Sequence, residues 1–206
     1  MDSVLRLTPE VLPRTLRMDP PVSDSEFEAL CRDNDSFYFE RTKEGAIRMN
    51  PPAGGWTSDG NAEIVYQLRG WWATHKRGRV FESSAAFRLP DGSILSPDAA
   101  YLSDARLRGL AKGALKGFPR VCPDFVIELL SESDSLPKLQ AKMADWMENG
   151  VLLGWLIDPY GRRVHTYQAS HPPQLFDGLT LAGQGPVEGF MLDLNPVWSC
   201  YEEYGN

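Results

Sequence analysis

Two carboxylates and a lysine in the middle of the chain have the chemical character of a hydrolytic site. Asp98 follows Pro97 in a Pro-Asp step, and Glu128 lies in a nearly continuous apolar run, residues 124–130. Lys142 comes shortly after that run, in a segment whose residue pattern predicts a helix. Carboxylate oxygens are ligands that Mg²⁺ prefers, and an ammonium group can stabilise the charge that develops on a phosphate. These groups are suited to metal-assisted hydrolysis of a phosphodiester.

Alternative residues for the lysine and for one carboxylate lie close in the sequence. Lys138 and Lys142 share one face of the predicted helix, so either ammonium could reach the strand of Glu128, and Lys142 is the first choice. Either could also be a surface residue whose stem covers apolar neighbours. Asp124 shares a strand face with Glu128, but at about 3.3 Å per residue it lies roughly 13 Å away, too far for one ion to bridge easily. Asp98, on a neighbouring strand, has no such restriction.

Glu63 is a further acidic candidate, on a segment with helical periodicity. Four apolar residues of this segment recur at a helical spacing and predict an amphipathic helix over residues 61–75: Ile64, Leu68, Trp71 and Trp72. Glu63, in the first turn of this helix, could simply favour its positive end. It could also be an additional carboxylate beside a metal ion. The Pro- and Gly-rich residues 51–60 predict a loop that could act as a mobile flap.

Other kinds of site find little support in the sequence. The three histidines and three cysteines are scattered, which indicates neither a zinc site nor a disulfide framework. A hydrolase built on a nucleophile such as Ser131 would need a nucleophile elbow or an ordered histidine nearby, and neither is visible. The first residues lack the pattern of a secretory signal, and no apolar run is long enough to span a membrane, so we expect a cytoplasmic protein.

The charge distribution limits how the protein could contact nucleic acid. A formal net charge of −7 argues against broad binding to phosphates, so any contact must be local. Every charged residue between Asp104 and Asp124 is basic, and this segment could be a solvated surface or could contact DNA phosphates near the site. Its basic residues are Arg106, Arg108, Lys112, Lys116 and Arg120.

The order of helical and strand patterns predicts a mixed α/β fold. Residues 1–22 are rich in proline and predict a loosely packed arm, whereas residues 23–206 suit a single domain. Ser23 and Glu26 have the spacing of a capping box that begins a short helix, and residues 37–50 predict a hairpin that turns at Gly45. The run 124–130 predicts a central strand covered on both faces. Other expected elements are strands at 80–83, 86–88, 98–102, 154–158 and 190–194 and a helix that ends at 149–150.

Several segments, taken together and in order, resemble a bacterial restriction-endonuclease-like family of the PD-(D/E)xK nuclease superfamily. The resemblance covers roughly residues 27–198, and its specificity lies in the combination rather than in any one segment. The segments are Phe87-Arg88-Leu89-Pro90-Asp91-Gly92, Ser96-Pro97-Asp98, Asp124-Phe125-Val126-Ile127-Glu128-Leu129, Lys142 to Gly150, and Gly154-Trp155-Leu156-Ile157-Asp158-Pro159.

The resemblance implies a restriction-endonuclease-like mixed β-sheet core flanked by helices, here with an N-terminal helix and hairpin extension. It also implies Mg²⁺ or Mn²⁺ as cofactor and often a homodimer. Asp98 and Glu128 take the two acidic positions of the motif, and Glu63 matches an extra acid on the preceding helix. The superfamily pattern has a lysine two residues after the second carboxylate, where this chain has Leu130. In the family the lysine is displaced onto the following helix, which indicates Lys142.

Two functions of different class are therefore expected. The first is a metal-dependent endonuclease that hydrolyses DNA, in which Asp98, Glu128 and Glu63 bind the metal and Lys142 assists the reaction. The second is a non-catalytic module that retains the nuclease fold and binds nucleic acid or protein. Leu130 at the usual lysine position and the negative net charge motivate the second hypothesis.

Overall fold

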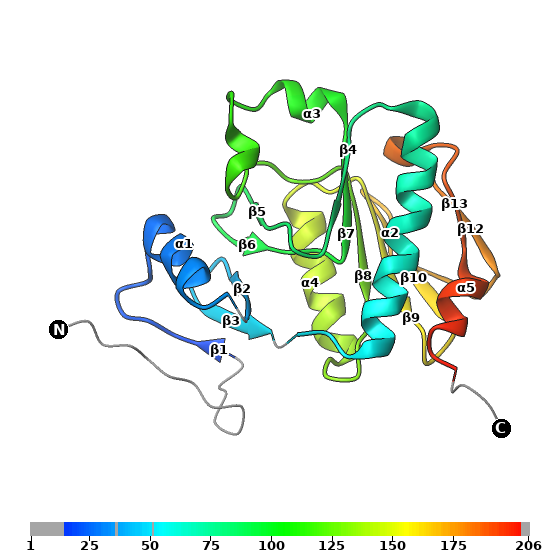
Figure 1. Cartoon of the computed structure of the whole chain (residues 1–206), viewed down its shortest axis with the longest axis horizontal. Helices are drawn as coiled ribbons and strands as arrows, with labels where there is room; N and C mark the ends of the chain where they lie inside the picture. Colours follow the sequence, from blue (N-terminus) through cyan, green and yellow to red (C-terminus); the bar gives the residue numbers. More distant parts are fainter. Residues whose placement is uncertain (1–14, 36, 51, 203–206) are drawn as a thin grey trace. The chain divides into compact units, whose positions relative to one another are not determined.

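The computed structural model describes residues 15–35, 37–50 and 52–202, and the chain divides into two compact units, residues 1–52 and 53–206 (Figure 1). In the first unit, helix α1 (Asp24–Asp33) begins with the expected capping box between Ser23 and Glu26. The expected hairpin consists of β2 (Tyr38–Arg41) and β3 (Ile47–Asn50), and Gly45 turns it at φ +80°. β1 (Thr15–Leu16) pairs with β3, while residues 1–14 of the expected arm lie outside the described residues.

The second unit is built on a six-stranded sheet of order β11-β10-β9-β8-β7-β4. Strands β8 and β9 run parallel, and helix α4 (Leu136–Glu148) is the crossover connection that a parallel pair requires; the other pairs are antiparallel. This arrangement confirms the mixed α/β fold, with β8 inside the sheet as its apolar run predicts. The strands are β4 (Arg79–Glu82), β7 (Ala99–Leu102), β8 (Phe125–Leu129), β9 (Leu153–Asp158), β10 (Arg163–Gln168) and β11 (Gln174–Phe176).

Smaller elements surround this sheet. Two short antiparallel pairs are formed by β5 (Phe87–Arg88) with β6 (Ile94–Leu95) and by β12 (Thr180–Ala182) with β13 (Met191–Asp193). The remaining helices are α2 (Gly55–His75), α3 (Asp104–Arg108), α5 (Leu194–Ser199) and the 3₁₀ helices η2 (Ala114–Lys116) and η3 (Gly185–Val187). Within the described ranges, none of the helices combines the length and the apolar character that crossing a bilayer requires.

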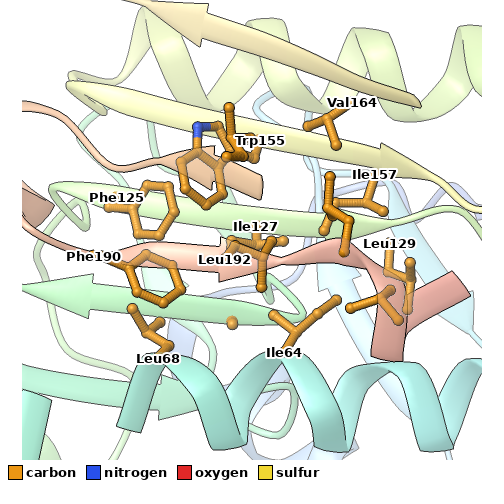
Figure 2. Packing of buried hydrophobic residues seen from close by; sticks show 14 of the residues in the cluster. Ile64, Leu68, Phe125, Ile127, Leu129, Trp155, Ile157, Val164, Phe190 and Leu192 are labelled. Atoms are coloured by element: carbon orange, nitrogen blue, oxygen red, sulfur yellow. The ribbon is translucent and has the colours of Figure 1, made fainter. Parts of the chain in front are cut away.

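Alternation along β8 divides the core of the second unit into two clusters. Phe125, Ile127 and Leu129 belong to the cluster that also contains Ile64 and Leu68 of α2, and Figure 2 shows these side chains between helix and sheet. Val126 belongs to the other cluster, with residues of α4. Since successive side chains of a strand point to opposite faces, Glu128 shares the face of Val126 and is directed towards α4.

Helix α2 begins at Gly55, earlier than the sequence predicts, so the expected loop over residues 51–60 is helical from residue 55 onwards. Thr57 and Gly60 are buried, and an alanine Cβ at Gly60 would lie only 3.0 Å from a methyl carbon of Leu129. This packing stabilises the first turns despite the low helix propensity of glycine. Glu63 therefore lies in the third turn of the helix, not in the first.

Candidate active site

The register of the sheet brings Asp98, the acid of the Pro-Asp step, next to Glu128. β7 is antiparallel to β8 and pairs Ala99 with Ile127, so Asp98, just before β7, comes next to Glu128 at the end of β8. The Leu129 N–H donates a hydrogen bond to Asp98 Oδ2 at 2.7 Å. A backbone amide of β8 thus holds the Asp98 carboxylate, which lies just before the neighbouring strand β7. The spacing of the two acids is set by strand pairing.

Helix α4 supplies two side chains that hold the Glu128 carboxylate. Lys142 Nζ lies 3.0 Å from it, and Trp146 Nε1 donates a hydrogen bond to Glu128 Oε1 at 2.8 Å. The Lys142 ammonium also donates to the Ser96 carbonyl at 2.7 Å, on the segment that leads into Asp98. The Lys142 and Glu128 side chains are only 13% and 4% exposed. Lys138, the alternative lysine, is exposed on the same helix, so the structure brings Lys142 to Glu128.

The electrostatics of Asp98 favour a positive partner. Burial raises the pKa of the Asp98 carboxyl, and the positive charge of Lys142 together with the hydrogen bonds from Leu129 and Asn61 partly opposes this rise. The negative charge of Asp134 adds a smaller contribution in the raising direction. A buried carboxylate in this situation gains from a nearby cation, because a cation offsets the cost of taking its charge out of water.

Asn61 of α2 is a site residue that the sequence did not reveal. Its Nδ2 donates to Asp98 Oδ1 at 3.0 Å, and its own Oδ1 is buried without a hydrogen-bond partner among the described residues. A buried carbonyl oxygen of this kind is available as a ligand or as an acceptor for water. An amide on a helix gives no recognisable signal in one sequence.

The oxygen atoms at this end of the sheet are of the type that a small hard cation prefers. Asp98 and Glu128 offer carboxylates and Asn61 offers a free amide oxygen, whereas the described residues contain no group of three or more His, Cys, Asp or Glu residues placed to hold a metal. Mg²⁺ binds proteins through one or two carboxylates and keeps several waters, so this donor set is sufficient for it. It is a poor set for zinc, which prefers nitrogen and sulfur ligands.

Glu63 faces away from this group. Its Oε1 accepts a hydrogen bond from Gln67 Nε2 on the same helix at 2.8 Å. Its charge is also one of the causes that raise the pKa of the Cys200 thiol to about 11, after burial and Asp59, so Glu63 lies towards α5. Two residues along an α-helix correspond to a rotation of about 200°. Glu63 and Asn61 therefore lie on nearly opposite faces of α2, and the structure brings Asn61 to Asp98.

Asp124 and Arg106 form a separate ion pair that serves the fold. Arg106 Nε lies 2.8 Å from Asp124 Oδ1, and the Ser103 N–H donates to Asp124 Oδ2 at 2.7 Å. The Arg106 guanidinium also donates to the carbonyls of Cys122 and Gly150. The Arg106 guanidinium therefore makes its contacts within the protein, and this counts against the expected contact with a DNA phosphate. The other basic residues of this segment are exposed: Arg108, Lys112, Lys116 and Arg120.

Leu130 and Ser131 also have local roles. Leu130, at the usual lysine position of the superfamily pattern, is buried in the cluster between the sheet and α4. The Ser131 hydroxyl donates to Asp134 Oδ2 at 2.6 Å and lies near Ser133 Oγ, and among the described residues these are its hydrogen-bond partners. This arrangement lacks the histidine that an activated serine needs.

Comparisons with known proteins agree with this architecture. A family model described as "Uma2: Putative restriction endonuclease" matches residues 24–195. The crystal structure of a "putative nuclease belonging to DUF820" from Anabaena variabilis has the same fold, with a TM-score of 0.67 and 22% identity over 79% of this chain and 90% of that chain.

A curated protein from Arabidopsis thaliana is also similar in sequence. It is the ERAD-associated E3 ubiquitin-protein ligase component HRD3B, 28% identical over 131 residues, which are 63% of this chain. The match spans only 20% of the length of that protein.

Proposed function

The chain belongs to the Uma2 family of restriction-endonuclease-like proteins, and from this premise we propose that it is a metal-dependent endonuclease that hydrolyses DNA phosphodiester bonds. The observation that carries the proposal is the position of the Lys142 ammonium. It bridges the Glu128 carboxylate and the Ser96 carbonyl, at the end of the sheet where Asp98 lies. Two carboxylates and an ammonium are groups that phosphodiester hydrolysis with a divalent cation uses.

Each group has a distinct role in this proposal. Asp98 and Glu128 would hold Mg²⁺ or Mn²⁺, with the amide oxygen of Asn61 as a third ligand in place of Glu63. A bound divalent cation supplies charge stabilisation on the phosphate and a water with a lowered pKa. Lys142, which donates a hydrogen bond to Glu128, would donate one to the attacked phosphate or to the incoming water during the reaction. Trp146 keeps the Glu128 carboxylate oriented while Lys142 makes these new contacts.

Metal binding and cleavage should be measured separately. Calorimetric titration with Mn²⁺ should give a binding signal for the wild-type protein that Asp98→Ala removes and Glu63→Gln leaves unchanged. Labelled single-stranded and duplex DNA should be cleaved only with Mg²⁺ or Mn²⁺, and Lys142→Met should abolish cleavage while still binding the metal. A well-folded wild-type protein that neither binds Mn²⁺ nor cleaves either DNA contradicts the proposal.

The Lys142–Glu128 ion pair and Leu130 favour a second candidate, a non-catalytic module that retains the nuclease fold and binds nucleic acid or protein. Such a module would bind DNA equally well with and without metal and would be indifferent to Asp98→Ala. Metal-dependent turnover that is lost in Asp98→Ala removes this candidate.

A homodimer and a cytoplasmic location are further parts of the proposal. The location is supported by Cys31, Cys122 and Cys200, which are free thiols, as expected in a reducing compartment. Light scattering of the purified protein measures its oligomeric state directly.

A further inference from the structure

Three aromatic side chains from distant parts of the chain gather in the second unit. The ring centroid of Tyr201 lies 6.5 Å from that of Trp56, at the start of α2, and 5.6 Å from that of Tyr160, in the turn between β9 and β10. The Tyr160 ring meets Tyr201 edge to face. Trp56 and Tyr160 are 39% and 50% exposed, whereas Tyr201 is partly buried between them and the core. We refer to Trp56, Tyr160 and Tyr201 as the aromatic rim.

The aromatic rim lies beside the Asp98 end of the candidate active site. A Cβ at Gly60 would meet a methyl carbon of Leu129 at 3.0 Å and the Tyr201 ring at 3.1 Å. Leu129 donates its N–H to Asp98, and Asn61, the residue after Gly60, donates to the same carboxylate. Two consecutive residues of α2, Gly60 and Asn61, therefore lie against the Tyr201 ring and the Asp98 carboxylate, respectively.

The Tyr201 hydroxyl lies within the electrostatic influence of Asp98. Its oxygen is buried and has no hydrogen-bond partner within the described ranges, although the Thr57 side chain lies near it. Burial raises the pKa of the Tyr201 phenol, and the negative charge of Asp98 adds to this rise.

We propose that the aromatic rim stacks an unpaired base of single-stranded DNA whose neighbouring phosphate enters the site at Asp98. This inference rests on the proposed function and names the preferred substrate class, DNA with unpaired nucleotides. Bases within a duplex are stacked on each other and present no free face, whereas an unpaired base can be placed against aromatic side chains. Aromatic rings from three separate segments beside a hydrolytic site have the composition of such a stacking surface.

The charges around Tyr160 favour a base over a phosphate at this position. Glu132, Asp158 and Asp134 act on the Tyr160 phenol and contribute, after burial, to raising its pKa. These carboxylates would repel a phosphate but not the uncharged plane of a base. A protein with a net charge of −7 also gains little from neutralising duplex phosphates, so stacking has to supply more of its affinity.

The test is a binding measurement without metal, so that no cleavage occurs. Fluorescence anisotropy in EDTA compares three labelled DNA probes on the full chain: a short oligothymidylate, an abasic strand with the same number of phosphates, and a duplex of the same length. Tyr160→Ala and Trp56→Ala alter exposed members of the rim and should fold normally. Tyr66→Ala is the matched control, since Tyr66 is 73% exposed on α2 and lies outside the rim.

The expected order of affinity is oligothymidylate first, with the abasic strand and the duplex weaker. Tyr160→Ala and Trp56→Ala should each weaken oligothymidylate binding by about five- to a hundredfold, whereas Tyr66→Ala should leave it unchanged. Equal binding of the abasic strand, no binding of oligothymidylate, or rim variants that behave like Tyr66→Ala would overturn the inference. Mn²⁺ titration and duplex cleavage report on the proposed function alone, so the two ideas can fail independently.

Discussion

Replacing Lys142 by methionine tests how firmly the ammonium group is bound at Glu128. Nζ lies 3.0 Å from the carboxylate, and at an effective dielectric constant of about 20 two unit charges at this distance attract each other by about 5 to 6 kcal/mol. Desolvation of both ions offsets much of this attraction, but removing one partner of a buried pair leaves the other charge uncompensated. Lys142→Met should therefore lower the free energy of unfolding at neutral pH by about 3 to 5 kcal/mol.

A double-mutant cycle isolates the interaction from the loss of packing. Methionine keeps the apolar stem of Lys142, and Glu128→Gln keeps an oxygen that can accept the hydrogen bond from Trp146 Nε1. The double variant Lys142→Met/Glu128→Gln should be clearly more stable than the sum of the two single losses predicts, because each single loss already contains the full loss of the interaction between Lys142 and Glu128. Urea unfolding followed by tryptophan fluorescence gives all four free energies.

A small loss of stability in Lys142→Met would refute this reasoning. If Lys142→Met costs less than about 1 kcal/mol, the pair behaves like an exposed ion pair. If the two substitutions are simply additive, the lysine and the carboxylate do not interact in solution. Either result would separate Lys142 from Glu128 and would weaken the assignment of Lys142 to the site.

Three further predictions concern pH, backbone strain and the thiols. Burial raises the pKa of Asp98 above its ordinary value of 3.8, so the folded state binds this proton more tightly and stability falls as pH rises through the raised pKa. Asp98→Asn should therefore be more stable than wild type at neutral pH, with a difference in urea midpoint that vanishes in acid; a constant difference contradicts this. Gly78→Ala should cost more than about 1 kcal/mol in urea unfolding, because φ is +67° and its Cβ would overlap the Leu102 carbonyl. Gly92→Ala, at φ +89° in open space, is the control and should cost less. Burial raises the pKa of the Cys31, Cys122 and Cys200 thiols to about 11. Iodoacetamide at neutral pH should therefore label these thiols slowly in the folded protein and quickly in denaturant. Equal labelling rates in the two states would count against their burial.

The sequence predicts the part of the site that depends on strands. An apolar run with one acid near its end predicts a buried strand, and β8 is buried along its whole length with Glu128 directed to one face. The Pro-Asp step places Asp98 at the start of the neighbouring strand, where antiparallel pairing sets its position. Lys142 lies on a helix, α4, that the sequence also predicts, and the apolar spacing of α4 determines which of its faces is buried.

The contribution of helix α2 could not be predicted from the sequence. Glycines before residue 61 indicate a loop by propensity, yet tertiary packing of Gly60 against Leu129 overrides that preference. The chosen acid, Glu63, is the only acidic residue of the predicted helix 61–75, whereas the contact to Asp98 comes from Asn61. Which of two polar residues faces the sheet depends on the rotation of the helix, and this rotation is set by residues elsewhere in the core.

The aromatic rim depends on contacts between segments that are distant in the chain. Tyr201 follows α5, a helix that the sequence pattern did not indicate because it is short. Its meeting with Trp56 and Tyr160 is a property of the tertiary structure, for which a single sequence contains no periodic signal.

Lys142 and Trp146 are one turn apart on α4, and both donate hydrogen bonds to the Glu128 carboxylate. Local opening of this single helix would release both contacts together, so the role proposed for Glu128 requires that α4 remains docked. Amide hydrogen exchange of the α4 backbone would then report the lifetime of the docked state. Substitutions on the apolar side of α4 could adjust that lifetime without altering any polar group of the candidate site.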